Sequence, residues 1–320
     1  MLSFLPPILR ATVAILLLVV NTLFWCVLLF ALALVKLLLP FAPVRAAIDP
    51  LLNGIATRWI AGNSAWMRLT QRTQWDVEGL EELGYGWYMV CANHQTWVDI
   101  FVLQHLLNRR IPLLKFFLKH ELIYVPVMGL AWWALDFPFM RRHSEKYLRR
   151  HPEKRLQDLE TTRRACAKFA RLPTSVMNFV EGTRFTAAKH AEQRSPYRHL
   201  LKPKAGALAL SLNALGGRFE SMLDATIVYP DGAPNFWQFL RGDVRRVVVR
   251  FDRHPIPHEF CTGDYMGDSK LRRRLQSWLH ELWHNKDVRI DAVLSGPRAG
   301  GAGSEAAGVR DSTANAHGSA

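Results

Sequence analysis

The decapeptide CANHQTWVDI, residues 91–100, places His94 and Asp99 five positions apart in a polar cluster that follows an apolar run. A carboxylate that contacts one imidazole nitrogen fixes the tautomer of the ring and makes the other nitrogen a better base. On one continuous helix the two side chains would point about 140° apart. The spacing therefore predicts a proton-accepting histidine if His94 precedes a helix and Asp99 lies in its first turn.

The same residues also fit an ordinary helix start. Thr96 and Asp99 match a T-x-x-D capping box directly before the apolar segment 100–107. This alternative explains Asp99 without catalysis and leaves His94 without a role. The two interpretations are compatible, because Asp99 can begin the helix with its backbone while its side chain orients the imidazole.

A second group with chemical potential is Glu181, Gly182, Thr183 and Arg184, within the sequence NFVEGTRF. Gly182 permits close approach to the backbone, and a guanidinium such as that of Arg184 binds phosphate oxygens in bidentate fashion. A strand-ending turn with a structural Glu181–Arg184 pair is the alternative. The tetrapeptide alone favours this structural alternative, so its chemical interpretation depends on the histidine cluster.

Alternating strands and helices are expected to position these residues. Strand patterns cover residues 73–83, 87–94, 174–185, 224–230 and 245–256, and helix patterns cover 98–107, 203–215 and 268–284. A highly charged helical pattern covers 144–171. Such alternation predicts an α/β fold.

The N-terminal part contains a 25-residue apolar run, residues 11–35, with Asn21 and Thr22 near its midpoint. As a helix this run would be about 37 Å long, which suffices to cross a bilayer with tilt. A signal peptide would have a shorter apolar core and a small-residue cleavage site. We expect a single transmembrane helix or a re-entrant hairpin that bends at Asn21 and Thr22. Basic residues follow the run, which places the globular part on the cytoplasmic side.

Four parts are expected along the chain: a membrane anchor at 1–45, an amphipathic linker helix at 46–73, a globular domain at 74–294 and a disordered tail at 295–320. The linker helix could lie on the membrane surface or pack on the domain. The tail is rich in Gly, Ala and Ser without periodicity.

Charge and cysteine content narrow the possible partners. The 320 residues contain 41 Lys and Arg and 27 Asp and Glu, a net charge of +14 that favours anionic partners such as lipid headgroups and phosphorylated substrates. No nucleic-acid partner is expected, because the basic clusters lack interleaved aromatic residues. Cys26, Cys91, Cys166 and Cys261 form no CxxC pair, and no metal site is expected, although His280 and His284 have a spacing that could bind metal incidentally.

In combination, the two groups resemble the blocks of the glycerolipid acyltransferase family, the PlsC-like 1-acyl-glycerol-3-phosphate acyltransferases in their bacterial branch. NHQTWVD resembles the NHxxxxD block, and FVEGTR resembles the FPEGTR block with Val180 in place of proline. KHELIYVPVMG, PFMRR and TIVYPDG resemble further blocks in the correct order, with Arg142 at the basic position of PFMRR. The resemblance covers residues 74–232, so residues 74–294 are expected to form an acyltransferase domain.

The resemblance implies a central mixed sheet flanked by helices and a defined reaction. A fatty acyl group would pass from acyl-CoA or acyl carrier protein to the sn-2 hydroxyl of 1-acyl-glycerol-3-phosphate, giving phosphatidic acid at the inner membrane. His94 and Asp99 would form the general-base dyad. No cofactor and no covalent enzyme intermediate would be required, because the carrier thioester is already activated.

The resemblance also implies roles for the residues around the dyad. Arg184, Arg142 and Lys119 would bind the phosphate of the acceptor, and Glu181, Gly182 and Thr183 would complete the acceptor site. Lys119 alone would more often be a solvated or interfacial lysine.

Three alternatives stay open from the sequence. The acceptor could be another lysophospholipid, as in membrane remodelling. The same base could activate water, which would make the protein a thioesterase. From a different class, the basic surface could belong to a non-catalytic protein that binds membrane surfaces.

Overall fold

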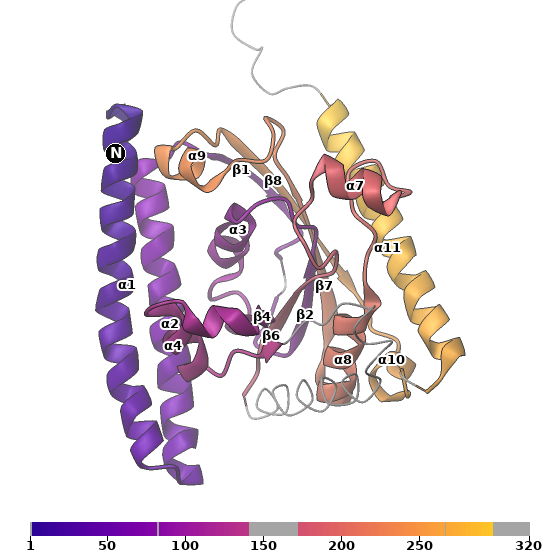
Figure 1. Ribbon diagram of the computed structural model, residues 1–320, viewed down its shortest axis with the longest axis horizontal. Coiled ribbons are helices and arrows are strands. Elements are labelled where there is room, and N and C mark those ends of the chain that lie inside the picture. Colours follow the sequence, from indigo (N-terminus) through magenta and orange to yellow (C-terminus); the bar gives the residue numbers. More distant parts are fainter. Residues whose placement is uncertain (1, 82, 141–171, 266, 297–320) are drawn as a thin grey trace, which may run out of the picture.

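The computed structural model describes residues 2–81, 83–140, 172–265 and 267–296, which form three layers (Figure 1). A six-stranded sheet consists of β1 (Gln74–Glu78), β2 (Tyr88–Ala92), β3 (Leu114–Phe116), β6 (Ser175–Phe179), β7 (Ser221–Val228) and β8 (Arg246–His254). One face is covered by α1 (Pro7–Leu38), α2 (Ala42–Thr70), α3 (Val98–Leu107) and α9 (Phe236–Arg241). The other is covered by α8 (Ala205–Leu215), α10 (His258–Thr262) and α11 (Ser269–Ser295).

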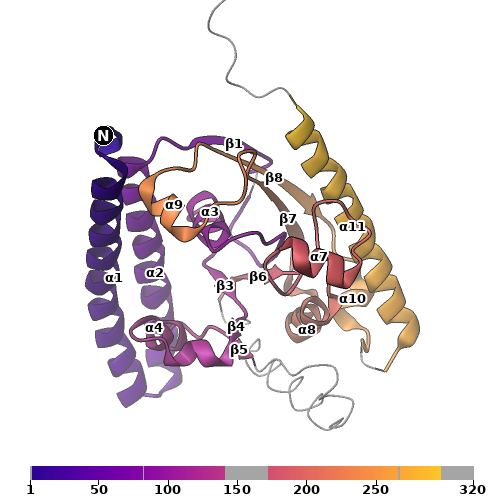
Figure 2. The same ribbon diagram turned by 45° about the horizontal axis from the view of Figure 1, so that its top comes forward.

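The smaller elements lie at the edges of these layers. They are β4 (Leu118–Lys119) and β5 (Phe139–Met140), which pair with each other, α4 (Met128–Ala134), α7 (Ala187–Gln193), and the 3-10 helices η1 (Leu2–Phe4), η2 (His120–Tyr124) and η4 (Gly216–Arg218). Figure 2 shows α4 beside the lower parts of α1 and α2, near β4 and β5.

The strand order of the main sheet is β1-β8-β7-β2-β6-β3, and all neighbours are parallel except β7 and β8. The expected α/β class with a central mixed sheet is therefore confirmed. Because β2 runs parallel to both of its neighbours, β6 and β7, the carboxyl ends of these three strands meet at one edge. In open α/β sheets, ligands bind at that edge.

Burial explains why β2 occupies the centre. All five of its residues are buried, and successive side chains enter opposite cores. Met89 and Cys91 pack toward α8 and α11, whereas Tyr88, Val90 and Ala92 pack toward α1, α2 and α3. A strand that is apolar on both faces is typical of a parallel sheet covered on both sides.

The two N-terminal helices form an antiparallel pair, and of the two expectations for residues 11–35, the alternative of a bend at Asn21 and Thr22 is wrong. Helix α1 continues through both residues, because they hydrogen-bond to α2 instead of opening the helix. Asn21 Nδ2 donates to Trp59 O and to Asn63 Oδ1, both at 2.9 Å, and Trp59 Nε1 donates to Thr22 Oγ1 at 3.1 Å. The chain turns at residues 39–41 instead.

Both ends of α1 contact the globular part of the chain. Near its beginning, Arg10 Nη1 donates to Arg241 O at 3.0 Å. Near its end, Lys36 Nζ lies 2.7 Å from Asp49 and 2.8 Å from Asp136. In the described part of the chain, α1 is the one helix that is long and apolar enough to cross a membrane.

The remaining predicted helices and strands differ from the structure mainly in their boundaries. The predicted helix 98–107 is α3, but the last helix does not end at His284 and continues to Ser295, because Lys286 and Ile290 are buried against the domain. Short strands β3 to β5 and helices α7, α9 and α10 were not predicted. The predicted helical region 144–171, Arg142, Cys166 and the tail beyond Gly296 lie outside the described residues.

Candidate active site

His94 lies in the turn between β2 and α3, at the carboxyl edge of the sheet. Strand β2 ends at Ala92, which pairs with Phe179 on β6 and Ala225 on β7. Helix α3 begins at Val98, so Asp99 lies in its first turn and His94 precedes it, as the spacing predicted. The imidazole stacks on the ring of Phe179, with ring centroids 3.8 Å apart.

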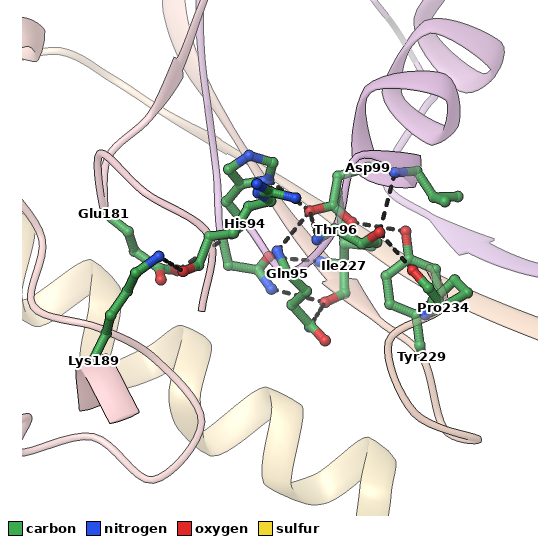
Figure 3. Close-up of polar contacts among 12 residues, drawn as sticks. His94, Gln95, Thr96, Asp99, Glu181, Lys189, Ile227, Tyr229 and Pro234 are labelled. Carbon is green, nitrogen blue, oxygen red and sulfur yellow. Dashed lines mark hydrogen bonds and ion pairs between the residues drawn. The ribbon is translucent and has the colours of Figure 1, made fainter. Parts of the chain in front are cut away.

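The predicted contact between the histidine and the aspartate is present (Figure 3). His94 Nδ1 lies 2.8 Å from Asp99 Oδ2, and the Asp99 side chain is fully buried. The same oxygen accepts hydrogen bonds from the backbone N–H groups of Gln95, at 2.6 Å, and Thr96, at 3.0 Å. An oxygen with these donors is an acceptor, so the Nδ1 proton belongs to His94 and Nε2 carries the free lone pair.

Only half of the predicted capping box forms. Asp99 accepts from the backbone of Thr96, but the Thr96 hydroxyl donates to Pro234 O at 2.5 Å and so ties the turn to the segment after β7. Asp99 thus begins the helix and orients His94 with the same carboxylate.

Hydrogen bonds hold the turn that carries His94 against the end of β7. Asn93 Nδ2 donates to Ile227 O, and Ile227 N donates to Asn93 Oδ1, both at 2.8 Å. Gln95 Nε2 donates to the same Ile227 oxygen at 3.0 Å. These contacts hold the residues on both sides of His94, so the backbone position of His94 is fixed.

Sequence reasoning missed Tyr229, which contacts the second oxygen of the carboxylate. Its hydroxyl donates to Asp99 Oδ1 at 2.7 Å (Figure 3). Burial, followed by the charge of Asp99, raises the pKa of Tyr229 well above its ordinary value, so the hydroxyl remains a donor. Its position in the sequence could have indicated this contact, because Tyr229 directly follows β7 and lies at the same edge of the sheet as His94 after β2.

Glu181 occupies a different place from the one expected for an acceptor-binding residue. Its side chain is 1% exposed, and its oxygens accept from the backbone N–H groups of His94, at 3.3 Å, and Leu201, at 3.4 Å. Burial raises the pKa of Glu181 to about 8, against the lowering effect of these two N–H groups. Glu181 therefore connects the His94 turn to the loop before α8, and it is not among the residues that line the cavity beside His94.

Gly182 and Arg184 extend from this point toward solvent. Gly182 has a φ of +71°, which a residue with a side chain rarely adopts, and its turn leads the chain past His94. Phe185 N donates to His94 O at 2.7 Å. The exposed Arg184 guanidinium lies 4.9 Å from the ring centroid of Trp97 and does not pair with Glu181.

Thr183 and Lys119 complete the predicted set within the described residues. Thr183 Oγ1 accepts from Lys189 Nζ at 2.8 Å, and Lys189 also donates to Arg184 O at 3.0 Å, so Lys189 braces this turn. Lys119 is exposed on β4 and lies on the wall of the same cavity as His94.

A cavity of about 830 Å³ connects these residues to the N-terminal helices. Its volume lies within the range of roughly 300–1,000 Å³ that is typical of ligand pockets. His94, Gly182, Thr183, Arg184 and Lys119 line one part, and the remaining lining is mainly apolar and comes from α1, α2, α3, α4 and β3. The arrangement offers a base at Nε2 of His94, cationic side chains nearby and an apolar space for a hydrocarbon chain.

The tertiary structure also gathers one group of potential metal ligands among the described residues. Asp224, Asp252 and His254 have ligand atoms within 4.8 Å of one another. Lys286 Nζ lies 3.0 Å from Asp224, and Arg289 pairs with Asp252. Cations already neutralise both carboxylates, so this group does not alter the expectation that the reaction requires no metal.

The fold and this arrangement define a class of protein. Residues 74–230 match the family model described as "Acyltransferase". The crystal structure of the 1-acyl-sn-glycerophosphate (LPA) acyltransferase PlsC from Thermotoga maritima has the same fold, with a TM-score of 0.51 and 16% identity over 89% of this chain and 98% of that one. Together with the curated relatives, the family model and this fold support a glycerolipid acyltransferase domain at residues 74–230.

Curated relatives agree with this assignment. The 1-acyl-sn-glycerol-3-phosphate acyltransferase gamma of Homo sapiens is 23% identical over 252 residues, which cover 70% of this chain and 61% of that protein. The 1-acyl-sn-glycerol-3-phosphate acyltransferase 3 of Arabidopsis thaliana is 24% identical over 238 residues, 69% of this chain and 57% of that protein. The match thus spans about three fifths of the length of these relatives.

Proposed function

We propose that the protein transfers a fatty acyl group from a thioester donor, acyl-CoA or acyl carrier protein, to the sn-2 hydroxyl of 1-acyl-glycerol-3-phosphate. The product is phosphatidic acid. One observation carries the proposal: the buried His94–Asp99 pair opens into an apolar cavity whose wall also carries Arg184. A hydroxyl group, an anionic headgroup and an acyl chain can then be accommodated together.

The reaction follows from the orientation of the imidazole. Nε2 of His94 removes the proton of the acceptor hydroxyl as its oxygen attacks the thioester carbonyl carbon. Asp99 stabilises the imidazolium that forms. When the tetrahedral intermediate collapses, the C–S bond breaks and the thiolate leaves, taking the proton from His94. A new oxygen ester is formed, and His94 is again neutral.

Arg184 supplies recognition of the acceptor. A guanidinium can bind the phosphate in bidentate fashion, and its position over Trp97 limits its freedom before the substrate arrives. Lys119 provides a second positive charge on the cavity wall. Arg142 stays a predicted phosphate ligand.

We further propose a membrane-bound enzyme whose catalytic domain lies at the cytoplasmic face of the inner membrane, and the apolar surface of α1 supports the membrane contact. Half of the 32 residues of α1 are apolar and exposed. Because Arg10 and Lys36 tie both ends of α1 to the globular part, we favour a helix pair that enters one leaflet and turns at residues 39–41 over a helix that crosses alone. Exposed apolar residues at that turn, Leu37, Leu38, Leu39 and Phe41, fit this placement.

The test is an assay of the purified full chain with lysophosphatidate and an acyl thioester, in which phosphatidate and free thiol are measured. His94→Ala should lower turnover by about 10²–10⁴-fold, the usual contribution of a general base. His284→Ala, an exposed histidine on α11, is the matched control. Near-normal turnover of His94→Ala contradicts the mechanism, and free fatty acid as the main product in excess acceptor identifies a thioesterase instead.

A further inference from the structure

The segment 122–135, LIYVPVMGLAWWAL, contains no charged residue. It nevertheless exposes five large side chains: Tyr124 (77%), Val125 (37%), Val127 (38%), Leu130 (51%) and Trp133 (46%). These are half of the ten exposed large apolar side chains that the structure describes after residue 70. A contiguous exposed apolar surface of this kind marks an interaction site, whereas single exposed residues do not.

The backbone of this segment is built to hold these side chains outward. Val127 has a φ of +64°, a left-handed conformation that is rare for a β-branched residue. Gly129 lies in the first turn of α4, where a Cβ atom would lie 2.1 Å from Ile123 O. Leu130 and Trp133 are three positions apart on α4 and share one exposed face, and Ala131 and Ala134 are buried on the other.

The position of α4 in the fold indicates what covers this face. Helix α4 contacts α1, whose exposed surface is apolar, and Lys36 of α1 pairs with Asp136 directly after α4 (Figures 1 and 2). Met128 and Trp132 of α4 line the same cavity as Trp25 and Leu29 of α1. The exposed surface of α4 therefore continues the apolar surface of the N-terminal helix pair, beside the cavity that contains His94.

We propose that residues 124–133 form a second membrane-inserting element, which dips into the lipid surface beside α1 and brings the cavity to the bilayer. This inference rests on the proposed function insofar as it takes the substrate to be a membrane lipid. Tyr and Trp side chains favour the interface between headgroups and acyl chains, which fits Tyr124 and Trp133. Insertion here lets the acceptor approach His94 without leaving the membrane entirely.

The depth of the segment can be measured on the full chain. A nitrobenzoxadiazole label is placed at Leu130→Cys, with Cys166→Ser to remove one competing thiol; Cys26, Cys91 and Cys261 are buried. The protein is bound to vesicles of phosphatidylcholine and phosphatidylglycerol. We expect quenching by spin-labelled lipid and protection from aqueous iodide. A label at Val288→Cys on α11, on the opposite side of the sheet, is the matched control and should respond to iodide alone.

A label at Phe24→Cys on α1 separates this proposal from membrane binding in general. Lipid quenching at residue 24 together with iodide access at residue 130 overturns the second element and leaves the anchor intact. Iodide access at both positions overturns it as well. The readout does not use acyl transfer, so lipid quenching at 130 in a protein without transfer supports this proposal and contradicts the proposed function.

A kinetic test uses the double variant Leu130→Glu, Trp133→Glu. The KM for lysophosphatidate in vesicles should rise about tenfold, which corresponds to about 1.4 kcal/mol, while turnover of a short-chain acceptor in solution stays unchanged. Val288→Glu should alter neither value. Equal KM values for the double variant and the parent protein in vesicles overturn the proposal.

Discussion

The hydroxyl of Tyr229 donates to Oδ1 of Asp99 at 2.7 Å, although the two residues are 130 positions apart in the chain. The other oxygen of this carboxylate accepts from His94 at 2.8 Å. One buried carboxylate thus joins the ends of β7 and β2. The proposed dyad is part of a larger unit, in which Tyr229 and two backbone N–H groups hold the aspartate that holds the histidine.

Removal of the Tyr229 hydroxyl should therefore slow the reaction. In Tyr229→Phe, Asp99 Oδ1 loses its donor in a fully buried site, and a hydrogen bond to a charged group contributes about 1.5–3 kcal/mol. We expect kcat/KM to fall by roughly 10- to 100-fold, as measured in the phosphatidate assay. Tyr85→Phe, at an exposed tyrosine, is the control. An unchanged kcat/KM for Tyr229→Phe would mean that the Tyr229 hydroxyl does not contribute to the function of Asp99.

Replacement of Asp99 by asparagine should be more severe. Three N–H donors converge on Oδ2 and Tyr229 donates to Oδ1, but an amide accepts at one end only and carries no charge, so the His94 ring loses the carboxylate that fixes its tautomer and stabilises its imidazolium. Turnover should fall by about 10²–10⁴-fold with the fold retained by circular dichroism. Asp231→Asn, an exposed aspartate just beyond β7, should keep normal turnover. Comparable rates for both variants would mean that Asp99 only begins the helix.

The raised pKa of Glu181 should be visible in the pH dependence of the free energy of unfolding. Its pKa is about 8 in the folded protein against an ordinary value of 4.5, mainly because of burial. Between these values the folded state binds a proton that the unfolded chain lacks. The stability due to Glu181 is therefore complete below about pH 4.5 and is lost as the pH rises toward about 8.

Glu181→Gln removes this titration, so the free energy of unfolding of the parent protein should decrease relative to that of the variant from about pH 5 to about pH 8. The expected change is a few kcal/mol and can be measured by denaturant unfolding in detergent. Glu192→Gln, at an exposed position on α7, should show no such trend. A pH-independent difference between parent and Glu181→Gln contradicts the proposed titration.

Arg184 should affect binding more than turnover. Arg184→Ala removes a cation from the cavity wall, and the KM for lysophosphatidate should rise about tenfold or more, with a smaller change in kcat. Arg184→Lys should recover only part of the loss, because an ammonium group lacks the bidentate geometry. Arg194→Ala, exposed at the end of α7, is the control. Full rescue by lysine would indicate that charge alone suffices.

Close packing of α1 on α2 should be sensitive to one glycine. A Cβ atom at Gly62 would lie 2.1 Å from Asn21 Oδ1, so Gly62→Ala must displace the Asn21 side chain and weaken its hydrogen bonds to α2. We expect a loss of about 1–3 kcal/mol, observed as a lower thermal midpoint in detergent. Gly206→Ala, in α8 with no neighbour within 4 Å, should be neutral or stabilising. A thermal midpoint for Gly62→Ala that matches the parent would argue against close packing at this point.

Local patterns in the sequence were sufficient for much of the site. The apolar run before Asn93 predicts a buried strand, and the following periodicity predicts a helix that begins just before Asp99. With both elements in place, a spacing of five residues brings His94 and Asp99 into contact across one turn. This contact joins residues that are close in the chain, so local backbone geometry is enough to bring them together.

Contacts between distant segments decided the rest. The sequence does not reveal that Tyr229 reaches Asp99, that Glu181 is buried under His94, or that Asn21 binds α2 instead of bending α1. Each depends on which strands and helices become neighbours, and that order is set by the packing of the whole core on both faces of the sheet. The sequence determined the contact between His94 and Asp99, and the tertiary structure determined which distant residues hold that pair in place.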